Sequence, residues 1–148
     1  FFMRLRIGYP DAANEREILR SSAGVQEIHF APALTADEVL QLQSWAGHVT
    51  VDNALVDYIL AIVEKTRTHE SLALGVSPRG AQALYRATQA LAMVEGREYA
   101  VPDDVKRLAV PVFAHRVVVN TRLALTQRTA DLNDRILEEI LTLVEVPL

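Results

Sequence analysis

The stretch that most constrains the fold begins at Gly75 and opens a helix-forming segment that continues to Glu95. Ser77 is a favourable N-cap, because its hydroxyl can accept a hydrogen bond from an amide of the first helical turn. Pro78 then takes the first helical position, where its fixed φ suits the helix and its missing N–H costs nothing. Alanine recurs through the segment, so neighbouring elements can approach closely. These residues predict a sharply started helix around which the rest of the chain is organised.

Arg79 follows in the first turn of this predicted helix. A cation is electrostatically misplaced there, because the helix dipole puts partial positive charge at that end. The misplacement is resolved if an anion lies at the helix start, since free amides, the dipole and a guanidinium would then converge on one phosphate or carboxylate. The alternative is an arginine that pairs with a nearby acid or is simply solvated. Spacing alone leaves both interpretations open.

Capping residues and apolar periodicity predict a mainly helical domain. Thr35 and Glu38 match a capping box, and the segment after Asp52 carries an apolar stripe with helical spacing. The expected helix starts are Asp11, Thr35, Asp52, Ser77, Pro102 and either Asp131 or Asn133. Five or six helices joined by short linkers, without repeats, are typical of a compact orthogonal or bundle-like α domain.

Segments with a strand pattern are few. Residues 2–9 alternate between apolar and polar, and a lone strand has no partner, so we expect its sheet to lie outside this chain. Residues 117–119 are β-branched and could be a strand or a frayed helix end. We expect a polar loop at 68–75 and a mobile loop at 120–130. Trp45 and Tyr58 are expected to fill the core or an interface.

The overall charge argues against a general nucleic-acid binder. The formal net charge is −4, whereas such proteins usually carry a basic balance. The longest apolar runs fall well short of the roughly 18 residues that a membrane helix needs. The sequence contains no cysteine, which excludes disulfides and thiolate metal sites.

Residues that could run a reaction alone are absent from the sequence. No glycine-rich turn is followed by lysine, so there is no P-loop. The serines lie in no nucleophile elbow. The four histidines show no ligand spacing, so we expect no metal site.

Several segments together resemble a known family. FFMRLRIGYP at 1–10 resembles the place where the ATPase core of MoxR-family AAA+ proteins ends and the lid begins, and GVSPRG at 75–80 resembles the sensor-2 motif of that family. Residues 81–117 resemble the family sequence that follows this motif almost throughout. A final helix that ends at 145–147 also matches the family pattern. Gly80 departs mildly from the pattern, where a small residue such as alanine is expected, and residues 120–130 match less clearly.

The resemblance implies a small helical-bundle AAA+ lid domain at 10–148, preceded at 1–9 by a residual strand and hinge from the α/β ATPase core. Arg79 would be the catalytic sensor-2 arginine that reaches the γ-phosphate of ATP, and Ser77 and Pro78 would aim it. Tyr9 would lie near the adenine. ATP and magnesium would be bound in the full-length protein, with the P-loop, the magnesium-binding acids and the arginine finger before Phe1. This chain alone is therefore expected to be inactive.

The family further implies a cytoplasmic, chaperone-like ATPase with subunits in a hexameric ring. Its expected partners are the ATPase core of the same chain, neighbouring subunits and a von Willebrand factor A domain protein, with no nucleic acid or membrane. One alternative is a stand-alone helical adaptor whose apolar grooves hold a peptide. Another is a DNA-binding helical regulator with a helix-turn-helix at 35–47 and 52–66. The acidic balance of the chain argues against DNA binding.

Overall fold

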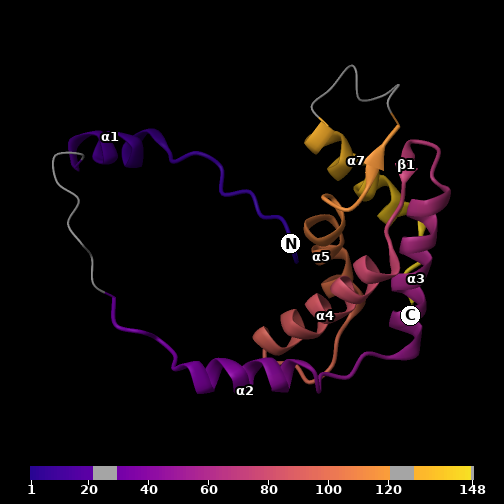
Figure 1. Ribbon diagram of the computed structural model, residues 1–148, viewed down its shortest axis with the longest axis horizontal. Helices are drawn as coiled ribbons and strands as arrows, with labels where there is room; N and C mark the ends of the chain where they lie inside the picture. Colours follow the sequence, from indigo (N-terminus) through magenta and orange to yellow (C-terminus); the bar gives the residue numbers. More distant parts are fainter. Residues whose placement is uncertain (22–29, 121–128, 148) are drawn as a thin grey trace.

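The computed structural model describes residues 1–21, 30–120 and 129–147, and helices dominate it (Figure 1). The helices are α1 (Ala12–Ser21), α2 (Ala36–Ala46), α3 (Asn53–Thr68), α4 (Pro78–Val94), α5 (Pro102–Phe113) and α7 (Thr129–Leu143), and the strands are β1 (Leu72–Leu74) and β2 (Val118–Val119). The predicted mainly helical fold is confirmed.

Most helices begin where local capping chemistry predicts. The Thr35 hydroxyl accepts from the Glu38 amide at 3.3 Å, and the Glu38 carboxylate accepts from the Thr35 amide at 2.7 Å. The hydrogen bonds that the Thr35 amide and hydroxyl donate to the Glu38 carboxylate lower the pKa of Glu38. Single side-chain caps accept from backbone amides at three further helix starts, namely Asp11, Asp52 and Ser77.

The start of the last helix differs from the prediction. Helix α7 begins at Thr129, so neither Asp131 nor Asn133 is its cap. Asn133 is instead buried inside the helix, and its Nδ2 donates to the carbonyl of Ala114 at 2.7 Å. A contact with a residue 19 positions away cannot be read from local capping patterns.

The small sheet also corrects the sequence interpretation. Strands β1 and β2 pair antiparallel, with Leu72 opposite Val119. The expected loop at 68–75 therefore contains a strand, and the β-branched run at 117–119 is the strand that completes it. The two strands are far apart in sequence, so composition near residue 72 could not indicate the pairing. The prediction of a mobile loop at 120–130 lies for the most part outside the described residues.

The expected residual strand at residues 2–9 is absent from the structure. Within the described residues this segment pairs with no strand, and it lies against α5 and α7 instead. The Arg4 amide donates to the carbonyl of Pro111 at 2.8 Å. The guanidinium of Arg6 pairs with Asp131 and Asp134, each at 2.6 Å, and Arg4 also pairs with Asp134.

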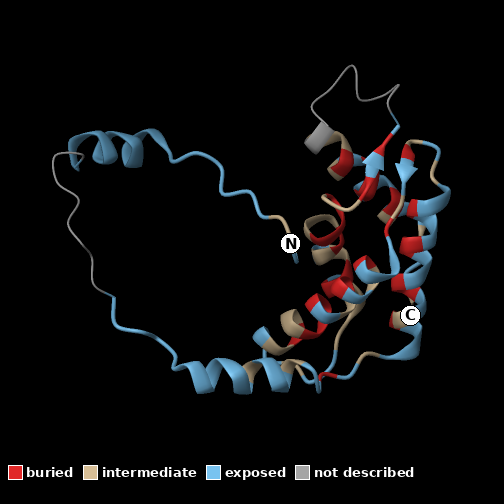
Figure 2. Ribbon diagram, viewed as in Figure 1, coloured by how far each residue is buried: buried red, intermediate tan, exposed pale blue. Residues whose placement is uncertain are grey.

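The core lies among α3, α4, α5 and α7 (Figure 2). Aliphatic side chains fill most of it, and Phe113 and Tyr58 are the buried aromatic residues in the described part of the chain. Tyr58 is 3% exposed, which confirms it as a core residue. Trp45 is 59% exposed, so it is not one. Neither α1 nor α2 has a buried residue.

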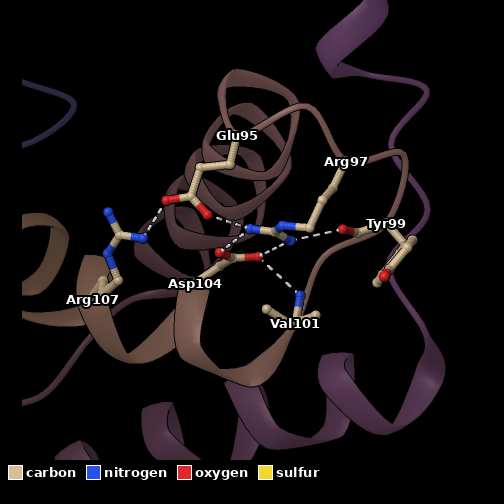
Figure 3. A network of polar contacts seen from close by, with 6 residues as sticks. All are labelled: Glu95, Arg97, Tyr99, Val101, Asp104 and Arg107. Atoms are coloured by element: carbon tan, nitrogen blue, oxygen red, sulfur yellow. Dashed lines mark hydrogen bonds and ion pairs between the residues drawn. The ribbon is translucent and has the colours of Figure 1, made fainter.

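A polar network fixes the corner between α4 and α5 (Figure 3). The Asp104 side chain, 1% exposed, accepts two hydrogen bonds from the Arg97 guanidinium, at 2.8 and 2.6 Å. It also accepts from the Val101 amide at 2.9 Å. Arg97 donates in addition to Glu95 at 2.8 Å, and Glu95 contacts Arg107. These contacts raise the pKa of Arg97 and lower that of Glu95.

Candidate functional site

A pocket of about 630 Å³ lies beside the first half of α4. Its size falls in the range of about 300–1,000 Å³ that is typical of small-molecule sites. The lining residues are Phe1, Phe2, Arg79, Gln82, Ala83, Arg86 and Arg116. Three of them are arginines and none is acidic. Like charges around one opening repel one another, and an anion bound between them would offset that repulsion.

Arg79 occupies the predicted place in the first turn of α4. Its side chain is exposed, and within residues 1–21, 30–120 and 129–147 it forms no hydrogen bond or ion pair. Pairing with an acid of the described domain is thereby excluded as the explanation for a cation at a helix start. The guanidinium, the dipole and the pocket all favour an anion at this position.

Ser77 and Pro78 also lie where the sequence predicts. The Ser77 hydroxyl accepts from the Gly80 amide at 3.3 Å, and Pro78 is the first residue of α4. Tyr9 lies elsewhere: its side chain is fully exposed and does not line the pocket. Gly8, with a positive φ of 74°, precedes it. Of the four predicted site residues, Arg79 alone lines this pocket, while Ser77 and Pro78 form the helix start directly before it.

Sequence reasoning missed Arg86 and Arg116. Arg86 follows Arg79 by seven residues, a spacing that places both on one helix face and that could have identified it. Arg116 comes from beyond the end of α5. Its Nε donates to the Val112 carbonyl at 2.9 Å, and its Nη2 donates to the Phe1 carbonyl at 2.7 Å. Only tertiary packing brings Arg116 to the pocket.

The loop that leads into α4 is held by the end of α3, through contacts that we name the start clamp (Thr66, Arg67 and the backbone of Val76). The buried Thr66 hydroxyl accepts from the Val76 amide at 2.9 Å and donates to the Val63 carbonyl at 2.6 Å. The Nε of Arg67 donates to the Val76 carbonyl at 2.9 Å. Both backbone polar groups of Val76 are thus bonded to neighbouring residues of α3.

Gly75→Ala is expected to destabilise the chain by about 1–3 kcal/mol, the usual cost of overpacking. An added Cβ would lie 2.7 Å from backbone atoms of both Thr66 and Arg67, which cannot move aside cheaply. Urea unfolding followed by circular dichroism measures the change. Ala73→Ser, at an exposed position in β1, is the control and should stay within about 0.5 kcal/mol. Equal stability of the two variants would contradict the close packing.

No group of three or more metal-ligating side chains occurs in the described part of the chain. Likewise, none of the described helices has both the length and the apolar character to cross a membrane.

Comparison with known proteins identifies the family. The family model for the AAA lid domain matches residues 64–140, which include α4, α5, the strands and most of α7. The chain therefore belongs to the AAA lid domain family.

The relatives include proteins named MoxR. The chain is 35% identical to "Chaperone MoxR1" of Mycobacterium tuberculosis over 128 residues, or 80% of this chain and 34% of that protein. It is 35% identical to "Uncharacterized protein YeaC" of Bacillus subtilis over 148 residues, or 99% of this chain and 45% of that protein. These matches confirm the MoxR-family resemblance, and the chain spans less than half the length of either relative.

A solved structure has the same fold. A crystal structure of a candidate ATPase from Cytophaga hutchinsonii superposes with a TM-score of 0.86 at 25% sequence identity. The match covers 100% of this chain and 47% of the other. The fold of this chain therefore corresponds to one part of a larger protein.

Proposed function

We propose that this chain is the lid of an ATP-hydrolysing MoxR-type AAA+ protein and that Arg79 is its sensor-2 arginine, reaching the γ-phosphate of ATP. The observation that carries the proposal is the position of Arg79. It lies exposed at the start of α4, has no polar partner in the described domain, and lines a pocket with Arg86 and Arg116 and no acid.

The catalytic contribution of Arg79 would be electrostatic. A guanidinium held at a fixed place can stabilise the negative charge that spreads over the transferring phosphoryl group. The pocket suits phosphate oxygens, but its lining residues include no carboxylate. Oxygen ligands from carboxylates are what magnesium needs, so the metal would be held by residues outside this pocket.

Lid movement would follow from where α4 lies. The helix begins at the pocket and packs against α3 and α5 through buried residues such as Leu84 and Ala87. A contact between Arg79 and a phosphate therefore acts on the whole helical body and not on a loose side chain. Loss of the phosphate on hydrolysis would release this constraint and change the lid angle.

The remaining assignments complete the proposal. Residues 1–9 would be the end of the ATPase core and the hinge, residues 10–148 the lid, and Tyr9, exposed beyond Gly8, would lie near the adenine. We further propose a cytoplasmic, chaperone-like protein whose subunits form a hexameric ring. The ATPase core, neighbouring subunits and a von Willebrand factor A domain protein would be its partners.

A structure of the whole protein with a non-hydrolysable ATP analogue tests the central assignment. We expect the Arg79 guanidinium within hydrogen-bond distance of a γ-phosphate oxygen, with Arg116 beside it. A structure in which the analogue is bound in the ATPase core and Arg79 points into solvent would overturn the proposal.

The isolated 148-residue chain is expected to bind ATP weakly, because the lid supplies arginines but no P-loop. Isothermal titration with ATP and magnesium should therefore show no tight binding at physiological salt, where exposed charges are screened. A micromolar dissociation constant would show that the lid forms a nucleotide site without the core. The proposal that the ATPase core supplies most of the nucleotide-binding groups would then be wrong.

A further inference from the structure

We propose that Thr66 and Arg67 are positioning residues that aim Arg79 through the start clamp. This inference rests on the proposed function, because it assigns a task to residues that act only through Arg79. Neither residue lines the pocket that Arg79, Arg86 and Arg116 share. Their influence must therefore pass through the backbone that joins α3 to α4.

The clamp acts on the residue that determines where α4 begins. Val76 immediately precedes the N-cap Ser77. Its amide donates to the Thr66 hydroxyl and its carbonyl accepts from the Arg67 Nε, both at 2.9 Å. Thr66 is 0% exposed, so its hydrogen bond with the Val76 amide does not compete with water. With both backbone polar groups of Val76 bonded, the peptide planes on either side have fixed orientations.

Close packing passes this constraint on to the first turn. The Val76 side chain is 1% exposed, and a Cβ added at Gly80 would come within 2.5 Å of its Cγ1. Val76 therefore touches the backbone of the turn that contains Arg79. On the other side, the backbone of Gly75 lies directly on that of Thr66 and Arg67. These contacts hold the backbone on both sides of Val76, so a shift at Thr66 is passed on to the first turn of α4.

Loss of the Thr66 hydroxyl would therefore move the start of α4. Valine has nearly the shape of threonine but can neither accept nor donate, so Thr66→Val leaves the buried Val76 amide without a partner. The loop must shift to satisfy that amide. A misplacement of about 1 Å at a catalytic group can cost about 100-fold in rate.

The test uses ATP hydrolysis by the whole protein. Thr66→Val is expected to lower kcat roughly tenfold, within the range set by small misplacements, while Thr66→Ser, which keeps the hydroxyl, stays close to the parent. Thr68→Val is the matched control, because Thr68 lies at the same helix end with an exposed hydroxyl bonded only within α3. Its kcat should not change.

A double variant separates positioning from general stability. If Thr66 acts through Arg79, then Thr66→Val adds nothing in an Arg79→Ala background, whereas an independent structural defect would slow that variant further. If circular dichroism shows that Thr66→Val does not fold, the same rate measurement is made on Arg67→Gln, whose side chain is exposed. If Arg79→Ala slows hydrolysis but neither Thr66→Val nor Arg67→Gln does, the positioning role is overturned and the proposed function stands. If Arg79→Ala has no effect, the proposed function itself fails.

Discussion

Arg79→Ala is expected to lower kcat for ATP hydrolysis by the whole protein about 100-fold or more, the usual loss when one donor to a developing charge is removed. The guanidinium makes no contact that holds the described domain together, because it is exposed and has no polar partner there. The thermal midpoint of the isolated chain should therefore stay unchanged. A large loss of rate without loss of stability identifies a group that works on the nucleotide.

Two further variants control this result. Arg79→Lys keeps the charge but not the planar donor geometry, so it should recover only part of the rate. Lys106→Ala removes a cation on α5 that does not line the pocket and should leave hydrolysis as it is. Steady-state rates that are equal for the parent and Arg79→Ala would remove Arg79 from the site.

Asp104→Ala is expected to destabilise the chain by about 1.5–3 kcal/mol, the usual contribution of hydrogen bonds to a charged group. The variant would leave the Arg97 guanidinium without its bidentate partner, and the Val101 amide at the start of α5 would lose its acceptor. Urea unfolding of the 148-residue chain measures the loss. Because α4 and α5 form the largest helix contact of the described fold, loosening their corner should unfold the domain as a whole.

Asp103 provides the matched control for this experiment. It lies in the same first turn of α5, but its side chain is 82% exposed, and its ion pair within the described residues is a 3.7 Å contact with Lys106. Asp103→Ala should cost no more than about 1 kcal/mol, the upper range for an exposed pair. Similar losses for the two variants would mean that helix-dipole effects, and not the buried network, stabilise this corner.

Local chemistry made much of the fold predictable. The caps at Asp11, Thr35, Asp52 and Ser77 depend on contacts within three residues, so the sequence alone indicates them. Arg79 was predictable for the same reason, since its misplacement at a helix start is a local property.

Features that join distant segments were not predictable. Strand β1 exists because residues near 119 pair with it, and Arg116 reaches the pocket only because α5 ends beside α4. Asp104 illustrates the point most clearly. As one of two acids at the start of α5, it lies where the helix dipole favours negative charge, but burial and the ion pair with Arg97 make it a structural residue that joins the two ends of the corner.

Gly80 was interpreted from sequence as a mild departure from the family pattern, and the structure gives it a physical reason. Val76 and Arg116 occupy the space that a Cβ would take, at 2.5 Å from the Val76 Cγ1 and 3.3 Å from the Arg116 Cδ. A chain with alanine at position 80 would need a different rotamer or a smaller side chain at position 76. The two positions are therefore expected to change together.

Every buried residue of the described chain lies at Val49 or beyond it. The slope of a denaturant titration reports the surface that unfolding exposes, so the described residues before Val49 would add less to this slope, residue for residue, than those after it. A shortened protein beginning near Val49 would therefore keep the buried core, but it would lose the ion pairs of Arg4 and Arg6 with α7 and the part of the pocket that Phe1 and Phe2 line.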